Sequence, residues 1–301
     1  MELRQLKYFV KTAETLNFSE AARLLFVTQS TLSQQIRQLE EELDVALFQR
    51  DSHSVRLTES GEHLLPCAKA TLQDAEQCLT RISDLKAALS GTLNIGITYS
   101  FVPILSETVK IFTNQYPGVK LNIVCRNMEI VLDMLKRRDL DFVLCYKPDY
   151  QDEEMESHAL FDENLCAIMS KDHPLAKRES LTIVDLLDQS MALPSKDTQA
   201  RQAFDRTYPG IDDKMHIQVE MNSVNVLLDL VRETKMITIL SQAALYHNDA
   251  LVAVPLDNPP IQMEGCVHTL RKTYRKRAAE EFIRILGQSN AVMVRANNWL
   301  K

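Results

Sequence analysis

The chain has 301 residues, of which 45% are hydrophobic and 25% charged, so a fully disordered protein is excluded and about two globular domains are expected. No apolar run reaches the ~18 residues of a membrane span, and the acidic start of the chain does not resemble a secretory signal. Six cysteines without a CxxC pair favour a reducing, cytoplasmic location. The net charge of −7 argues against a nucleic-acid-binding protein.

The distribution of charge weakens that last argument. Residues 1–60 hold seven Lys and Arg against nine Asp and Glu, yet residues 21–39 contain Arg23 and Arg37 and no acid. The acids follow as Glu40-Glu41-Glu42 and Asp44. A locally acid-free surface does not repel phosphates.

The first sixty residues predict three helices. Apolar residues at helical spacing predict a helix over 3–15. Ser19 is the expected N-cap of a second helix, and Thr28 of a third over 29–42, whose inward stripe is Leu32, Ile36, Leu39 and Leu43. Two helices joined by a short turn form a helix-turn-helix.

The outward face of the third helix is polar and free of acids. Its residues are Gln29, Ser30, Thr31, Ser33, Gln34 and Arg37. Such side chains suit base edges in the major groove, although an ordinary solvated face has the same composition. Residues 48–50 and 55–57 then predict two short strands joined by a polar turn, a wing on which Arg50, His53 and Arg56 are placed to contact DNA.

Five separated pieces of this region appear in order at a specific spacing: Leu6-Lys7-Tyr8-Phe9, Phe18-Ser19-Glu20-Ala21-Ala22, Thr28-Gln29-Ser30, Leu47-Phe48-Gln49-Arg50 and Leu57-Thr58-Glu59-Ser60-Gly61. Together they resemble the winged helix-turn-helix of LysR-type transcriptional regulators. The resemblance implies that Gln29, Ser30, Ser33, Gln34 and Arg37 read the groove. Many members carry Pro where this chain has Ser30, which bears on base preference rather than on docking.

A long helix is predicted after Thr58-Glu59-Ser60. Leu65, Ala68, Leu72, Ala75, Leu79, Ile82, Lys86 and Leu89 follow a 3,4 spacing. This heptad seam favours a helix that pairs with a second copy, with a single core helix as the alternative. LysR-type proteins have a similar dimerising linker helix. Pro66 lies inside it and should kink it or confine its first turn.

The remaining residues alternate between strands and helices. Strands are predicted at 93–97, 121–125, 141–145, 165–169, 191–193, 217–221 and 236–240, and helices at 102–116, 129–136, 183–187, 199–207 and 224–233. This alternation predicts parallel sheets covered by helices.

The resemblance implies an α/β effector domain with two lobes, like a periplasmic binding protein, with the chain crossing twice between the lobes. The expected domains are a winged helix-turn-helix over 1–58, a dimerising linker helix over 59–89 and an effector-binding domain over 90–301. Lobe one covers 91–161 and 268–301, and lobe two covers 162–267.

Ligands of open parallel sheets bind beyond the carboxyl ends of the strands, where helix N-termini point their N–H groups. The candidate effector contacts at such positions are Thr98, Tyr99, Ser100, Phe101, Asn127, Met128, Pro194, Ser195, Arg201 and Ser223. Any single hydroxyl at a helix start is more often just an N-cap, so several of them converging in one cleft count for more than any one alone. Met128, where many acid-sensing members have Ser or Thr, and Thr234-Lys235-Met236, in place of a Gly-rich turn, favour an effector unlike a small dicarboxylate.

No nucleophile–base pair, P-loop or His spacing typical of a metal site is present, so we expect no catalytic residue, cofactor or metal. The cysteines fit buried apolar positions better than redox sensing. We interpret the chain as a transcription regulator whose partners are operator DNA, a small-molecule effector, further copies of itself (dimer or tetramer) and RNA polymerase, and not a membrane. An enzyme or ligand carrier and an architectural DNA binder are the competing classes. The acidic balance predicts weak non-specific DNA affinity.

Overall fold

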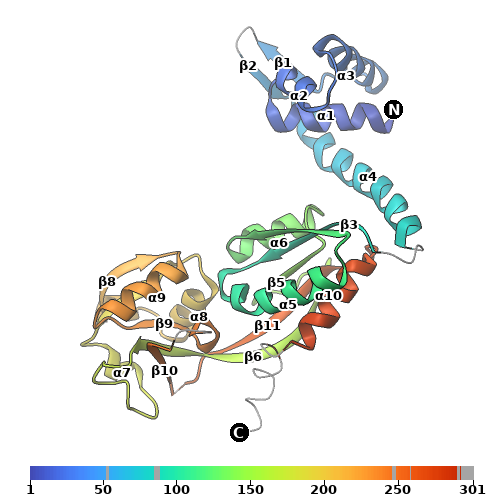
Figure 1. Cartoon of the computed structure of the whole chain (residues 1–301). Helices are drawn as coiled ribbons and strands as arrows, with labels where there is room; N and C mark the ends of the chain where they lie inside the picture. Colours follow the sequence, from blue (N-terminus) through green and yellow to red (C-terminus); the bar gives the residue numbers. More distant parts are fainter. Residues whose placement is uncertain (52–53, 85–88, 246–248, 258, 290–291, 293–301) are drawn as a thin grey trace. The chain divides into compact units, whose positions relative to one another are not determined.

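The computed structural model describes residues 1–301 except 52–53, 85–88, 246–248, 258, 290–291 and 293–301. The chain divides into two compact units, residues 1–86 and 87–301. Figure 1 shows a first unit of helices with one small hairpin, and a second unit in which helices cover strands.

The first unit has the predicted winged helix-turn-helix order. Its elements are α1 (Leu3–Thr15), α2 (Phe18–Leu24), α3 (Gln29–Leu43), β1 (Phe48–Asp51), β2 (Ser54–Leu57) and α4 (Glu59–Asp84). Thr28 caps α3 as predicted, because its Oγ1 accepts a hydrogen bond from the backbone N–H of Thr31 at 3.2 Å.

The predicted N-cap of α2 is wrong. Asn17, not Ser19, caps this helix, and its Oδ1 accepts a hydrogen bond from the N–H of Glu20 at 3.0 Å. Phe18 is the first helical residue because its ring is anchored in the core, with its centroid 5.5 Å from that of Phe48. That anchor places Ser19 inside the first turn, where its hydroxyl is exposed.

The core of the first unit lies between the three short helices and the hairpin. Leu32, Ile36 and Leu39 on α3 are completely buried, which confirms most of the predicted stripe. Phe48 at the start of β1 packs against both Phe9 and Phe18. The hairpin is therefore held against the helices by aromatic packing as well as by its own strand pairing.

The predicted heptad seam on α4 is divided between two roles. Leu65, Ala68 and Leu72 pack against the core of the first unit, and Ala68 is 1% exposed. Further along the helix, Leu79 and Ile82 are 74% and 64% exposed. Lys86 lies outside the described residues, and Leu89 belongs to the core of the second unit instead of the helix. Only the second half of the described seam is therefore free to meet another chain.

The start of α4 packs closely against the residues that precede β1. Thr58 donates a hydrogen bond to the carbonyl of Ala46 at 2.6 Å and accepts one from the N–H of Gly61 at 3.1 Å. A Cβ on Gly61 would lie 2.3 Å from the carbonyl oxygen of Leu47, so no larger residue fits there without a shift of the backbone. Helix α3, the β1–β2 wing and the start of α4 are thus packed together in one unit.

The second unit contains the remaining elements. They are β3 (Gly91–Ile97), η1 (Tyr99–Phe101), α5 (Val102–Gln115), β4 (Val119–Cys125), α6 (Met128–Lys136), β5 (Phe142–Tyr146), β6 (Met155–Ser170), α7 (Ile183–Leu186), β7 (Ser190–Pro194), α8 (Gln199–Thr207), η2 (Ile211–Lys214), β8 (His216–Met221), α9 (Val224–Glu233), β9 (Thr238–Ser241), η3 (Gln242–Leu245), β10 (Leu251–Pro255), β11 (Gln262–Leu270) and α10 (Arg277–Gly287).

The expectation of purely parallel sheets is wrong in part. Strand β3 pairs in parallel with β4 and β5, and β7 pairs in parallel with β8. In contrast, β11 pairs antiparallel with both β5 and β6, and β9 and β10 pair antiparallel with β6. The long strands β6 and β11 thus take part in every one of the antiparallel pairs described in this unit.

The two lobes share these two long strands. Figure 1 shows α5, α6 and α10 grouped around β3 and β5, and α7, α8 and α9 grouped with β8 and β9, with β6 and β11 running between the groups. The C-terminal helix α10 returns to the first group, where Phe282 packs against Phe112 and Phe142. Any movement of one lobe against the other must therefore bend or twist β6 and β11.

Strand β5 shows why lobe one is a sandwich of helices around a sheet. All five of its side chains are buried. Phe142, Leu144 and Tyr146 face one core, while Val143 and Cys145 face the core beneath α6. Because side chains alternate along a strand, a continuous apolar run is what a strand covered on both faces requires.

His268 on β11 is a fully buried polar residue in this lobe. Its Nε2 donates to the carbonyl of Cys145 at 3.3 Å, and its Nδ1 accepts from the hydroxyl of Ser157 at 2.9 Å. Burial lowers the pKa of His268 to about 4, from an ordinary value of 6.5. The folded protein therefore holds this imidazole neutral.

This burial predicts a pH-dependent stability. Between pH 6.5 and about 4 the unfolded chain binds a proton at His268 that the folded chain does not, so the free energy of unfolding falls as the pH falls through this window. The loss amounts to about 3 kcal/mol at its lower end. Urea unfolding at several pH values measures it. His268→Gln should flatten the slope, and His158→Gln, at an exposed position, should not; equal slopes in all three proteins would contradict the prediction.

Candidate functional site

The outward surface of α3 carries the predicted reading residues together. Gln29, Ser30, Thr31, Gln34 and Arg37 are exposed, and Ser33 is half-buried. No carboxylate occurs on α3 before Glu40. The surface thus offers donors and acceptors for base edges without a charge that repels phosphate.

Some of these side chains are held by short local contacts. The Thr28 hydroxyl lies 3.0 Å from that of Ser30 and 2.8 Å from that of Thr31, and Gln29 Nε2 donates to Ser33 Oγ at 2.9 Å. Within the described part of the chain, Gln34 and Arg37 have no hydrogen bond or ion pair of their side chains. Gln34 and Arg37 are consequently available to a partner without breaking an internal bond.

The wing has the predicted two strands. Gln49 lies opposite Arg56 and Arg50 opposite Val55 in the antiparallel pair. The Arg56 side chain is exposed. The structure describes the backbone of Arg50 but not its side chain, and His53 lies outside the described residues.

Three of the nearby carboxylates are engaged by other groups, while Glu41 and Asp44 at the end of α3 are exposed. Glu40 Oε1 accepts the backbone N–H groups of Leu47 at 2.8 Å and Phe48 at 3.1 Å, which joins the end of α3 to the start of the wing. Glu42 pairs with the N-terminal amine of Met1. Glu20 forms two hydrogen bonds with Arg23, at 2.9 and 2.6 Å. These contacts leave the face of α3 electrostatically open.

In the second unit, six of the predicted effector residues line one cavity between the lobes. They are Thr98, Tyr99, Ser100, Asn127, Met128 and Pro194. The same cavity is also lined by Asp197, Thr198, Gln199, Ala200, Val224 and Leu240. Asn127 additionally caps α6, with its Oδ1 accepting the N–H of Ile130 at 3.1 Å. Capping and cavity lining are thus compatible at this residue.

Thr98 has an unusual environment in this cavity wall. Its side chain is 6% exposed, and its Oγ1 has no hydrogen-bond partner among the described residues. A buried hydroxyl without a partner costs free energy, which a bound ligand can recover.

Gln199, which sequence reasoning did not single out, connects the lobes. Its Nε2 donates to the carbonyl of Tyr146 at 2.8 Å, and its Oε1 accepts the N–H of Tyr146 at 3.2 Å. The same amide nitrogen lies 2.8 Å from the sulfur of Met128. A second bridge runs from Asn127 Nδ2 to Asp197 Oδ2 at 3.4 Å. The start of α8 is therefore fastened to lobe one mainly by uncharged amide groups.

Asp197 is the single carboxylate among the lining residues that the structure describes. The hydroxyl of Ser195 donates to its carboxylate and lowers its pKa, with a smaller lowering from Asn127. The same set of described lining residues includes no Lys, Arg or His. This lining therefore carries one ionised carboxylate and no balancing cation.

A neighbouring cavity lies on the other side of Gln199. It shares Met128 and Gln199 with the first and is also lined by Tyr146, Lys147, Arg206 and Glu264. Its two cations are paired, Lys147 with Glu264 at 2.7 Å and Arg206 with Asp149.

The structure does not bring the other four predicted effector residues into the cavity lining. Phe101 is completely buried and packs against the rings of Tyr146 and Phe161. Ser195 is engaged with Asp197, and Ser223 lies at the N-terminus of α9, beside the lining residue Val224. Arg201 is 1% exposed and faces the interior of lobe two.

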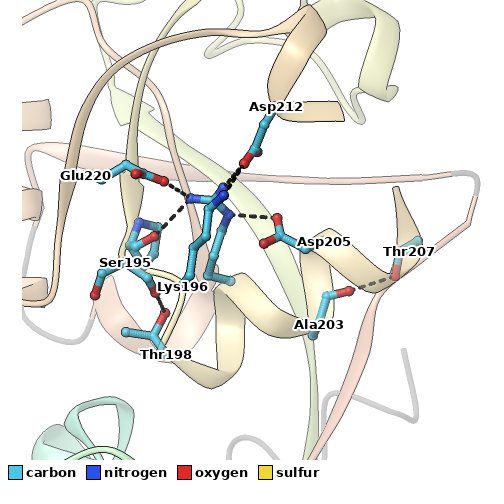
Figure 2. Close-up of polar contacts among 10 residues, drawn as sticks. Ser195, Lys196, Thr198, Ala203, Asp205, Thr207, Asp212 and Glu220 are labelled. Atoms are coloured by element: carbon cyan, nitrogen blue, oxygen red, sulfur yellow. Dashed lines mark hydrogen bonds and ion pairs between the residues drawn. The ribbon is translucent and has the colours of Figure 1, made fainter. Parts of the chain in front are cut away.

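Arg201 forms ion pairs with three carboxylates, those of Asp205, Asp212 and Glu220, which Figure 2 labels. Its Nε donates to Asp205 at 2.7 Å, and its other two nitrogens contact Glu220 and Asp212. Burial alone would lower the pKa of Arg201, but the carboxylates outweigh it and raise that pKa. Arg201 also donates to the carbonyl of Pro194 at 3.3 Å, so it fixes the loop from β7 to α8 that carries Asp197 and Gln199.

This network predicts a large cost for removing the cation. Arg201→Met leaves three carboxylates facing one another and should lower the free energy of unfolding by about 2–3 kcal/mol, somewhat less than for a fully buried pair because the carboxylates are partly exposed. Lys196→Met, which removes an exposed partner of Asp212, should cost much less, because solvent screens an exposed ion pair. Urea unfolding of both variants measures the difference, and similar losses would contradict the structural role of Arg201.

The expectation of buried cysteines is confirmed only in part, because Cys67 and Cys78 on α4 are exposed and Cys125 is half-buried. Cys145, Cys166 and Cys266 are buried, and burial raises the pKa of each thiol. No group of three or more His, Cys, Asp or Glu side chains in the described ranges is arranged to hold a metal ion. Among the helices that the structure describes, none is long and apolar enough to cross a membrane.

Comparison with known families and proteins agrees with both units. The family model "LysR substrate binding domain" matches residues 86–291, and "Bacterial regulatory helix-turn-helix protein, lysR family" matches residues 3–62. The regulator EstR of Acinetobacter baylyi is 31% identical over 265 residues, 86% of this chain and 87% of that protein. The dual regulator GltC of Bacillus subtilis is 29% identical over 266 residues, 87% of this chain and 88% of that protein.

Solved structures share the fold. A full-length OxyR variant of Pseudomonas aeruginosa matches with a TM-score of 0.74 at 24% identity, covering 98% of this chain and 96% of that one. Full-length CbnR in complex with its target DNA matches with a TM-score of 0.66 at 18% identity, covering 96% and 99%.

The chain belongs to the LysR family of transcriptional regulators. It is a DNA-binding regulator with a helix-turn-helix domain and an effector-binding domain of two α/β lobes, which confirms the interpretation of its sequence. Members of this family are regulators and not enzymes; they bind DNA and small-molecule effectors and form oligomers.

Proposed function

We propose that the chain reads an operator through the outward face of α3, with Gln29, Ser30, Thr31, Ser33, Gln34 and Arg37 in the major groove. The observation that carries this proposal is the exposed, acid-free row on a helix whose Gln34 and Arg37 have no internal partner in the described chain. The hydroxyl of Thr28 and the wing residues Arg50, His53 and Arg56 are proposed to contact the sugar–phosphate backbone.

Specific binding requires two copies in this proposal. Leu79 and Ile82 expose most of their apolar surface and lie at the 3,4 spacing that a helix pair needs. We propose that α4 of a second copy packs against these two side chains. Pairing of the two α4 helices would place two α3 helices on a partly palindromic site. Because the first unit is acidic overall, single units should bind DNA weakly.

We propose that the effector binds between the lobes, in contact with Thr98, Tyr99, Ser100, Asn127, Met128 and Pro194. The unpartnered Thr98 hydroxyl supports a ligand that supplies a hydrogen bond. Such a ligand would compete with the Gln199–Tyr146 bridge and change how the lobes close. A change of lobe geometry in a dimer alters the spacing or bend of the DNA contacts.

The chemistry of the lining supports an uncharged or cationic head group. A dicarboxylate would face Asp197 without a cation in the described lining to balance it. An amide, alcohol or amine can instead donate to Asp197 and exchange hydrogen bonds with Thr98. This agrees with the expectation, drawn from Met128, that the effector is unlike a small dicarboxylate.

We further propose the division into a DNA-binding domain over 1–58, a linker segment over 59–89 that contains α4, and an effector-binding domain over 90–301. A location in the cytoplasm and a contact with RNA polymerase complete the proposal. Both follow from the role of the family in transcription, which acts on DNA at promoters.

The DNA-reading proposal predicts the effect of one substitution. Gln34→Ala should weaken specific operator binding about ten-fold, because it removes one base-reading side chain. Footprinting at the upstream region of its own gene identifies the operator, and fluorescence anisotropy measures the affinity. Unchanged affinity would place Gln34 outside the groove.

Two controls separate reading from assembly. Gln34→Ala should leave the mass in analytical ultracentrifugation unchanged. Leu79→Asp should instead yield monomers and lose operator affinity through loss of pairing. If the wild-type protein protects no DNA site at any salt concentration, the proposal that the outward face of α3 reads an operator is wrong.

The ligand proposal predicts a preference between two isosteric compounds. Succinamide should raise the melting temperature of the protein more than succinate does, because succinate brings two carboxylates to Asp197. Asp197→Asn should narrow that difference, and thermal unfolding with each compound measures it. A larger stabilisation by succinate in the wild-type protein would contradict the proposal.

A further inference from the structure

Phe26 occupies the turn between α2 and the reading helix in an uncommon conformation. Its φ is +55°, in the left-handed region. Its N–H donates to the carbonyl of Arg23 at 3.2 Å, and the N–H of Val27 donates to that of Ala22 at 3.0 Å. These two bonds form a Schellman motif in which Phe26 holds the position that glycine usually occupies.

The fold itself gains little from a phenylalanine at this point. The side chain is 96% exposed, the largest value among the large apolar side chains that the structure describes. Glycine adopts this backbone conformation without the steric strain that a Cβ brings. An aromatic ring that is strained in the backbone and left in water calls for a partner outside the unit.

The position of Phe26 identifies that partner. It precedes the cap Thr28 by two residues, and Gln29 and Ser30 open the reading helix directly after the cap. In a helix-turn-helix the N-terminal residues of the second helix contact base edges, so the turn before it reaches the border of the groove. Val27 after it packs against the core of the first unit, polar side chains follow from Thr28 on, and one ring does not provide the area of a stable protein interface.

We propose that the ring of Phe26 makes an apolar contact with operator DNA at the edge of the major groove. The contact rests on the proposed reading of DNA by α3. The apolar groups of DNA at this border are the thymine 5-methyl group and the deoxyribose ring, and phenylalanine packs against both.

The test compares full-length variants on the operator found by footprinting. Phe26→Gly should weaken binding about five-fold, because it removes the ring while keeping the left-handed backbone. Phe26→Leu should retain most of the affinity, and Phe26→Asn should lose as much as Phe26→Gly. The slope of log affinity against log salt should stay unchanged, because an apolar contact releases no counterions, whereas Arg56→Gln, at a proposed phosphate contact, should reduce it.

Leu16→Gly is the matched control. Leu16 also has a positive φ, of +48°, at the C-cap of a helix and is 47% exposed, but it ends α1 and not the helix before the reading helix. This variant should bind as the wild type does. An equal loss in Leu16→Gly would show that backbone loosening weakens binding, and would overturn the proposal.

Two further arms resolve the contact. Thymines at the groove border are replaced by uracil one at a time, which removes the 5-methyl group. If the ring contacts a methyl group, one replacement should reduce the affinity of the wild type and leave that of Phe26→Gly unchanged. If no replacement reduces the wild-type affinity while Phe26→Gly still binds more weakly, the ring contacts deoxyribose. Wild-type affinity in Phe26→Gly overturns the proposal alone, whereas absence of any site-specific binding by the wild type overturns it together with the reading surface. A loss of dimers in Phe26→Gly by ultracentrifugation would instead assign the ring to a second copy and overturn the DNA contact.

Discussion

A chain with an excess of acids meets a polyanion only if its carboxylates are held away from the contact surface. In the first unit some of them are engaged by other groups, while Glu41 and Asp44 at the end of α3 stay exposed. Glu40 binds the backbone N–H groups of Leu47 and Phe48, and Glu42 binds the N-terminus. The same Glu40 contacts fix the wing to the end of α3. One carboxylate thus serves both the electrostatics of the reading surface and the geometry around it.

In the second unit it is the cations near the cavities that are paired with carboxylates. Arg201, Arg206 and Lys147 are each paired with carboxylates, and the described lining of the cavity between the lobes holds no cation. The lobes are joined at α8 by the amide of Gln199 and the backbone of Tyr146. A neutral hydrogen bond contributes only about 1 kcal/mol net. Such a bridge is easily exchanged for bonds to a ligand, which suits a regulated closure.

Local patterns predicted much of the fold and a part of the site. The spacing of Leu32, Ile36 and Leu39 identified the inward face of α3, because helix periodicity is a local property. The cap at Asn17 was missed because Asn17 and Ser19 are both good caps, and the burial of Phe18 decides between them. Antiparallel pairing by β11 was missed because strand direction depends on contacts between residues far apart in the chain.

The cavity shows the same limit. Thr98 and Asn127 were found because they follow strands and precede helices. Arg201 has the chemistry of a ligand contact, and only the arrangement of Asp205, Asp212 and Glu220 around it turns it inward. Gln199 carries no pattern of its own, and its role comes from the position of Tyr146 across the cleft.

The division of α4 has a mechanical consequence. Its first half is packed into the same core as the reading helix, with Ala68 buried and Gly61 pressed against Leu47. Its exposed second half is therefore a rigid extension of the winged helix-turn-helix. A rotation of α4 at Leu79 and Ile82 therefore turns the whole winged helix-turn-helix, because the same helix continues into its core. In the proposed pairing of two copies, the angle at which the two α4 helices cross would set the distance between the half-sites.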